Sequence, residues 1–343
     1  MDTKGTWAVT GPADAAGRLH LSLRTDSTAW SEPVTREELR GLGDDALASP
    51  TSTPASFRVE REAGVFAMEG SFEGGKGSGR FVFHPGRAFA PALRAHGVAD
   101  ADALTDRDLM TLAQTGASSA AIGELAALVG PLEVRSVMQL VVHGVTPDYV
   151  RTMRALGVGG TETVAGAVEL RIHGVTAEYV RELEEAGYPG LSREQLLEMG
   201  IHGVRGDEIR ALLAAGVPRL PPRELVNLRI HGVTAAFVRQ MGEAGLDGLT
   251  PQALVDLRIH GVTAEYVREL GALGYSGLTR RQLMEMGIHG VTPAFIRALR
   301  EKGISGVSPE KLVEMKIHGT HPPLPVGRLV RTVKVRTPSV PEA

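Results

Sequence analysis

The pattern of apolar and polar positions changes near residue 87. Before it, apolar and polar residues alternate: Leu19, Leu21 and Leu23 are each followed by a polar residue, which places the leucines on one face of a strand. Further short apolar segments with strand character lie at residues 7–9, 57–59, 65–68 and 80–83. Turns are expected at residues 62–64 and 74–79, one helical turn at 35–42 and a loop at 44–55. The pattern predicts a small antiparallel β-domain over residues 1–87.

After residue 87 one phrase, Ile-His-Gly-Val-Thr, returns with small variations. His-Gly occurs seven times, and each copy follows the last after about 29 residues, a regular period that indicates a repeat architecture. The histidines of this repeated turn are His143, His173, His202, His231, His260, His289 and His318.

One unit, residues 175–203, illustrates the local structure. Thr176 is a good N-cap, apolar residues then recur at three- and four-residue steps, and Gly187 can end the helix. A second helix starts at Ser192, which can form a capping box with Gln195, and its apolar face includes Ile201. Each unit is therefore predicted to be a helix–turn–helix.

The array extends further back than the first His-Gly pair. Residues 104–110 copy residues 191–197, which lie three repeat periods later, and residues 89–96 resemble a lone leading helix. We therefore predict an α+β chain in which an α-solenoid of about eight helix pairs covers residues 88–319, with the sheet abutting the first helices through Phe89. A Pro-containing tail follows at 320–343, with one short strand around Val330, Val333 and Val335.

Composition narrows the class of protein. The net charge of -3 argues against a dedicated nucleic-acid binder, and no apolar stretch is long enough to span a bilayer. The absence of cysteine excludes disulfides and thiolate metal sites but leaves the compartment open. No export signal follows Met1, which slightly favours the cytoplasm; a trimmed upstream segment would allow an extracytoplasmic location.

The repeated histidines have a structural and a chemical interpretation. One imidazole per repeat places neighbours about 10 Å apart, too far to share a metal ion with bonds of about 2 Å. A ring N–H that satisfies a free carbonyl at the helix end is the favoured interpretation. If the rings are buried and neutral, their pKa values are lowered, and stability should fall as the pH drops below about 6.5.

A second series consists of arginines seven residues after each repeat glycine. It comprises Arg151, Arg181, Arg210, Arg239, Arg268 and Arg297. These residues should line one side of the stack and form a candidate stripe for a protein or peptide partner. The favoured alternative is a solvated face on which glutamates of the same helices pair with the arginines, such as Glu178 with Arg181. Aromatic residues two positions before the arginines are expected to fill the core between units.

Motifs for catalysis are not recognised. The glycine-rich run at 74–79 leads into a strand rather than a helix, which argues against a phosphate-binding loop. Nucleophile-elbow and zinc-peptidase motifs do not occur in the sequence. We therefore expect no enzyme activity, no cofactor and no metal site.

The sequence resembles a known bacterial region. Residues 70–83, followed by Leu-Arg-Ile-His-Gly-Val-Thr repeats at 170–181, 228–239 and 257–268, resemble the segment after the membrane-bound metallopeptidase domain in some sensor-transducers of the beta-lactam-receptor type. Similar repeats occur in stand-alone bacterial proteins. The peptidase's zinc motif and membrane helices are absent here, so the resemblance implies an accessory sensing or interaction region and no peptidase activity.

The sequence as a whole favours a non-catalytic scaffold for protein or peptide binding, because solenoids present long surfaces. One alternative is a self-assembling, oligomer- or filament-forming protein, and another is a ligand-sensing regulatory region. Exposed apolar residues along one face of the stack would favour the scaffold. Exposed apolar residues at its two ends would favour assembly.

Overall fold

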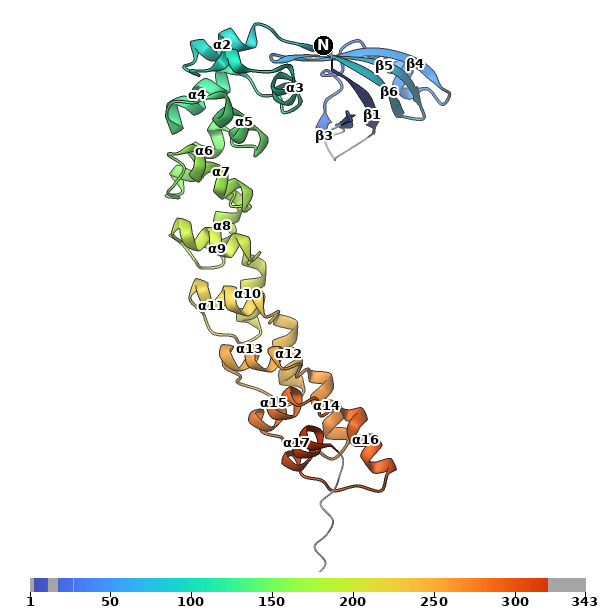
Figure 1. Cartoon of the computed structure of the whole chain (residues 1–343), viewed down its shortest axis with the longest axis vertical. Helices are drawn as coiled ribbons and strands as arrows, with labels where there is room; N and C mark the ends of the chain where they lie inside the picture. Colours follow the sequence, from blue (N-terminus) through green and yellow to red (C-terminus); the bar gives the residue numbers. More distant parts are fainter. Residues whose placement is uncertain (1–2, 12–17, 27, 320–343) are drawn as a thin grey trace, which may run out of the picture. The chain divides into compact units, whose positions relative to one another are not determined.

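The computed structural model describes residues 3–11, 18–26 and 28–319. An antiparallel sheet is followed by short helices packed in regular pairs (Figure 1), which confirms the predicted α+β class with a helical repeat region. The chain divides into two compact units between Ile209 and Arg210. The tail at 320–343, with the strand expected around Val330, lies outside the described residues.

The sheet has six strands in the order β3-β2-β1-β6-β5-β4, all antiparallel to their neighbours. The strands are β1 (Thr3–Thr10), β2 (Leu19–Arg24), β3 (Ala29–Val34), β4 (Thr53–Arg61), β5 (Gly64–Glu73) and β6 (Lys76–Pro85). Alternate side chains of β1, β2, β4, β5 and β6 are buried, as the alternation of apolar and polar residues predicts. Trp7, Phe57 and Phe72 form one aromatic cluster of this core, with ring centroids 4.9–6.2 Å apart.

Several of the local elements predicted for the β-domain have the wrong bounds or the wrong type. The loop expected at 44–55 contains helix α1 (Asp44–Ala48) and the start of β4. The segment 35–42 forms turns and an isolated bridge between Arg40 and Arg58 in place of a helical turn. The turn expected at 74–79 is confined to Gly74 and Gly75, because β6 begins at Lys76.

Strand β3 was not predicted, and it carries a carboxylate on the partly buried side. Glu32 lies opposite Leu21 of β2 and accepts a hydrogen bond from Arg61 at 3.1 Å. Arg61 also contacts Glu38 at 2.8 Å. Burial raises the pKa of Glu32 to about 7, against the attraction of Arg61. Arg61, at the end of β4, therefore joins the opposite edge strand β3 to the 35–42 segment.

Stability of the β-domain is expected to depend on the protonation of Glu32. Its folded pKa of about 7 lies above the ordinary value of 4.5, so the folded state holds the proton more tightly. The contribution is complete below pH ~4.5 and is lost as the pH rises through about 7. Unfolding in urea, followed by the fluorescence of Trp7 and Trp30, should show a midpoint that falls between pH 5 and 8. Glu32→Gln should remove this fall, and Glu37→Gln should keep it; an equal slope in both variants would contradict the assignment.

Helices α2–α17 form eight pairs in the described residues, as predicted. Even-numbered helices, here called row A, are α2 (Phe89–Ala95), α4 (Ser119–Val129), α6 (Pro147–Ala155), α8 (Ala177–Glu185), α10 (Gly206–Ala214), α12 (Ala235–Glu243), α14 (Ala264–Ala272) and α16 (Pro293–Glu301). Odd-numbered helices, row B, are α3 (Asp106–Gln114), α5 (Val134–Val142), α7 (Val164–Ile172), α9 (Arg193–Ile201), α11 (Pro222–Ile230), α13 (Pro251–Ile259), α15 (Arg280–Ile288) and α17 (Pro309–His318). Within each unit, most helices contact the next member of their own row.

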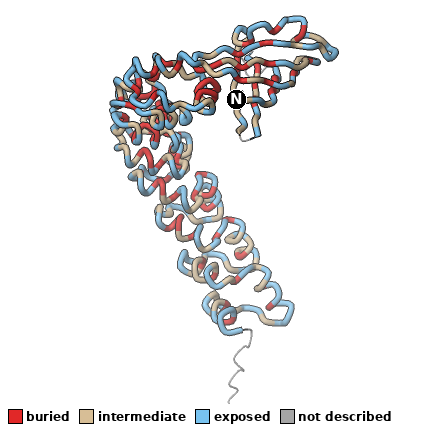
Figure 2. The backbone as a smooth tube through the Cα atoms, turned by 45° about the horizontal axis from the view of Figure 1, so that its top comes forward, coloured by how far each residue is buried: buried red, intermediate tan, exposed pale blue. Residues whose placement is uncertain are grey.

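The predicted caps form the helix ends. The Thr176 hydroxyl accepts a hydrogen bond from the backbone N–H of Tyr179 at 3.2 Å, and Ser192 forms the capping box with Gln195. Gly187 has φ +93°, the left-handed conformation that favours glycine. Short helices, most of nine residues, alternate with these turns, and buried and exposed positions alternate along the helices (Figure 2).

The sheet covers the first helices of the repeat region. Helix α3 contacts β5 and β6, and Phe89 at the start of α2 is fully buried. The backbone N–H of Ser119 donates to the Glu62 carboxylate at 2.9 Å, and its hydroxyl donates to the same group. The β-domain therefore contacts the first repeats through α3 and Ser119, while the contact through Phe89 stays a prediction.

Candidate binding surface

Neighbouring repeats are joined by the aromatic residues of row A. The hydroxyl of Tyr149 donates to the carbonyl of Val175 at 2.8 Å, and Tyr179 donates to Val204 at 2.8 Å. Tyr266 repeats this contact with Val291 at 2.7 Å. Burial raises the pKa of each of these three tyrosines to about 12. These aromatic residues therefore fill the space between neighbouring repeats, and their hydroxyl groups link the repeats by hydrogen bonds.

Removal of one such hydroxyl should have a limited, local effect. Tyr179→Phe is expected to lower the free energy of unfolding by about 1 kcal/mol, because a buried hydrogen bond is lost while the ring stays. Phe237 occupies the equivalent position two repeats later and is buried, so the phenyl ring itself fits. Urea unfolding followed by circular dichroism measures the change, and a loss above about 3 kcal/mol would show that more than one hydrogen bond is involved.

The repeated histidines lie at the ends of row B helices. Six of them are the residue after the last helical position, and His318 is the last residue of α17. Nδ1 of His231 lies 2.9 Å from the carbonyl oxygen of Asn227, the contact expected at a helix end. His143, His202, His289 and His318 are exposed and the other three are half-buried. The condition for the predicted acid lability, burial of the rings, is therefore not met.

The residue before each repeated histidine is an exposed aliphatic side chain. Val142 is 55% exposed, and the corresponding isoleucines are 51–55% exposed. These seven residues, here called the aliphatic row, are Val142, Ile172 and Ile201 in the first unit and Ile230, Ile259, Ile288 and Ile317 in the second. They nearly exhaust the large exposed hydrophobic residues of the described chain, since Leu213 is the one other. Ile201 was predicted to belong to the apolar face of its helix, and this is wrong.

Polar groups flank the aliphatic row on the same helices. The residue three positions earlier, on the same helix face, is Glu169, Glu198, Asn227, Asp256, Glu285 or Glu314. In two helices of the second unit, the residue directly before the isoleucine is a cation that lies over a ring of row A. Arg258 lies over the Phe237 ring at 5.1 Å, and Lys316 lies over Phe295 at 4.8 Å. The exposed strip therefore combines an aliphatic side chain, an imidazole and, in most repeats, a carboxylate.

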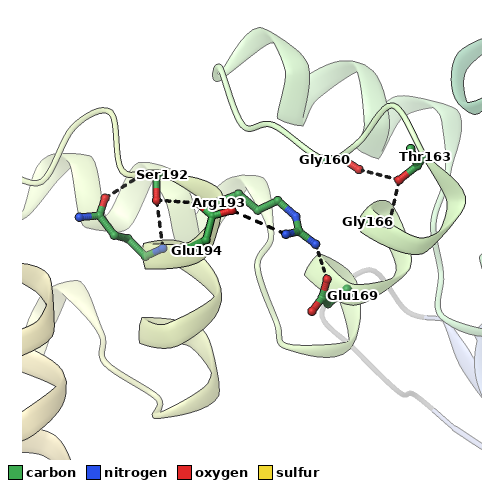
Figure 3. A network of polar contacts seen from close by, with 8 residues as sticks. Gly160, Thr163, Gly166, Glu169, Ser192, Arg193 and Glu194 are labelled. Carbon is green, nitrogen blue, oxygen red and sulfur yellow. Dashed lines mark hydrogen bonds and ion pairs between the residues drawn. The ribbon is translucent and has the colours of Figure 1, made fainter.

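One of these carboxylates also joins two repeats. The guanidinium of Arg193 at the start of α9 pairs with Glu169 of α7, while Ser192 and Thr163 cap their own helices (Figure 3). In the second unit, Glu285 pairs with Arg281 at 2.9 Å and Glu314 with Lys311 at 2.8 Å. Exposed pairs of this kind contribute about 0–1 kcal/mol and exchange readily with other partners.

The arginine series lies on row A, and all six side chains are exposed. Arg151 pairs with Glu124, and Arg297 pairs with Glu269 at 2.6 Å. Both pairs join neighbouring helices of the row, whereas pairing within one helix was expected. Arg181, Arg210, Arg239 and Arg268 form no ion pair within the described residues.

A cleft in the second unit adjoins one of these arginines. It measures about 380 Å³ and is lined by Val217, Val238, Leu246 and Leu254, with Arg239 and Glu243 at its polar side. A smaller cleft of about 120 Å³ lies at equivalent positions in the first unit, beside Val158 and Val180. These clefts are separate and are lined by residues of both rows, while row B offers a regular series of exposed apolar side chains.

The fold defines this chain as a helical-repeat protein with an antiparallel β-domain. No group of three or more His, Asp and Glu side chains within the described ranges is placed to hold a metal ion. No helix among the residues described is long and apolar enough to cross a membrane. Comparisons with protein families, curated proteins and solved structures give no match for this chain. The resemblance to the sensor-transducer region therefore stays a prediction.

Proposed function

We propose that this chain is a non-catalytic repeat scaffold that binds a protein or peptide partner along the aliphatic row. The supporting observation is the half-exposure of one aliphatic side chain in each of seven successive repeats. Single exposed hydrophobic residues are ordinary, but a series at one structural position gathers apolar area on one face of each unit. A ligand that lies across the helices of a unit would remove this area from water.

The position of the row favours a scaffold over self-assembly through the ends of the stack. The sheet contacts helix α3 of the first pair, and in the last helix Leu312 and Met315 are buried. The large exposed hydrophobic residues of the described chain lie along row B instead, apart from Leu213. A ligand-sensing role would use the same surface if the ligand is a peptide.

A displayed library of random peptides tests the proposal. Peptides enriched on the wild-type chain would be synthesised, and their affinity measured by calorimetry for the wild type and for Ile230→Ser/Ile259→Ser/Ile288→Ser. Each substitution removes apolar contact area, so binding should weaken at least about tenfold. Because all three side chains are about half exposed, the variant should retain its circular dichroism spectrum and unfolding midpoint.

The matched control is Arg239→Ser/Arg268→Ser, which changes exposed row A residues of the same unit. It should leave the affinity within about twofold of wild type. A loss of binding confined to the arginine variant would transfer the binding surface to row A. Failure of the library to yield any binder dependent on the isoleucines would refute the proposal.

A further inference from the structure

The aliphatic row of the second unit ends close to the start of the tail. Ile317 is its last member, and Gly319, two residues later, is the last residue that the structure describes. Residues 320–343 follow in the sequence. A binding sequence within residues 320–343 would therefore be attached to the chain next to the last member of the row.

Residues 328–336, here called the tail segment, have the composition of a ligand for this surface. The sequence is Arg-Leu-Val-Arg-Thr-Val-Lys-Val-Arg. Cations recur every third residue at Arg328, Arg331 and Lys334, and Val330 and Val333 are also three residues apart. The segment contains no acidic residue.

The spacing of the tail segment fits the spacing of the helices. Three residues of a polyproline-II chain span about 9 Å and bring the side chain back to the same face, and packed helices lie about 8–10 Å apart. Side chains three residues apart can therefore meet the isoleucines of successive row B helices. Helices α11, α13, α15 and α17 contact one another in order, so nine residues in this conformation, about 28 Å long, span the three steps between Ile230 and Ile317.

Charge on the strip favours a basic ligand. Asp256, Glu285 and Glu314 each lie on the same helix face as an isoleucine of the row. Glu285 and Glu314 pair with Arg281 and Lys311 of their own helices, but such exposed pairs are weak and can exchange for a cation of a ligand. Arg258 and Lys316, which precede the isoleucines, lie over aromatic rings of row A. Cations at every third position of the tail segment can reach these carboxylates while the valines cover the isoleucines.

We propose that the tail segment binds in cis on the aliphatic row between Ile230 and Ile317, so that the chain carries its own competing ligand. The stretch between Gly319 and Arg328 reaches up to about 30 Å, enough to turn back along the row, and tethering gives the segment a high effective concentration there. The inference rests on the proposed function, because it assigns the same row as a binding surface.

Cross-linking tests the position of the tail segment, since the chain has no cysteine of its own. In the full chain, Thr332→Cys would be combined with His289→Cys beside the row, or with Arg268→Cys, an equally exposed position on row A. The first pair should form a disulfide within the monomer about tenfold faster than the second, at a rate independent of protein concentration. Equal rates would overturn the inference, and disulfides formed between chains would assign the row to a second copy.

Peptide affinity separates this inference from the proposed function. Val330→Ser/Val333→Ser should bind the selected peptides about tenfold more tightly than wild type, because the competing segment is weakened. Unchanged affinity, with binding still dependent on the isoleucines, would refute the tail inference and leave the scaffold intact. If no peptide depends on the isoleucines in either chain while the His289 disulfide forms in cis, the scaffold proposal fails, and the tail remains the ligand of the row.

Discussion

Replacement of Leu257 by alanine is expected to lower the free energy of unfolding by about 2–5 kcal/mol, because the cavity left in a packed core cannot close fully. Leu257 is fully buried in α13, a helix that packs between its neighbours of row B. Urea unfolding followed by circular dichroism at 222 nm measures the loss. The tryptophans of the β-domain, Trp7 and Trp30, provide a separate signal in the same experiment.

The matched control is Ile259→Ala on the same helix. Ile259 stands two residues later, and 55% of its surface is exposed, so its truncation should change stability by no more than about 0.5 kcal/mol. The same change should weaken binding of peptides selected on the wild type. A destabilisation equal to that of Leu257→Ala would show that the aliphatic row is part of the core. The proposal that the row is a binding surface would then be refuted.

The pair also explains why the row was missed in the sequence. Leu257 and Ile259 look equally apolar, and a repeated phrase invites the interpretation that all its apolar residues are core. On a helical projection the isoleucine lies outside the arc occupied by the buried positions, such as Leu196 and Met199 in α9. An apolar residue kept outside that arc in repeat after repeat is the signal that could have identified it.

Local signals predicted the repeat helices well because each signal acts within a few residues. The Thr176 cap, the Ser192 capping box and the left-handed glycines fix the ends of the helices without help from distant contacts. The regular repeat period then transfers one unit's structure to the others. The ion-pair partners of the arginines could not be predicted from local signals, because Arg151 pairs with Glu124 of the preceding row A helix.

Strand β3 was missed for a different reason. Its inward positions include Glu32, and Pro33 lies in the same strand, so the alternation that identifies a half-buried strand is interrupted. Proline is tolerated there because β3 is an edge strand of the sheet. The carboxylate is tolerated because Arg61 reaches it from the end of β4. Both reasons depend on contacts between distant segments, which the local pattern does not encode.

The second substitution with a large expected effect on stability is at Gly70, where the backbones of two strands are in close contact. Gly70 of β5 pairs with Gly79 of β6, and Gly79 pairs with Trp7 of β1. A Cβ added at Gly70 would overlap the Ser78 carbonyl oxygen and lie 2.8 Å from the Trp7 ring. Backbone cannot yield as a side-chain end can, so Gly70→Ala is expected to destabilise the β-domain by about 3 kcal/mol, the upper part of the range for overpacking.

Tryptophan fluorescence makes this effect specific, because both tryptophans belong to the β-domain. Trp7 is 2% exposed and donates from its indole to the Glu69 carbonyl at 3.2 Å, so a displaced ring should change both the emission maximum and the urea midpoint. Gly159→Ala is the control, since no atom lies within 4 Å of its added Cβ. An unchanged tryptophan midpoint in Gly70→Ala would mean that the strands separate without loss of stability. The sheet could then not act as the rigid cap on which the first repeats pack.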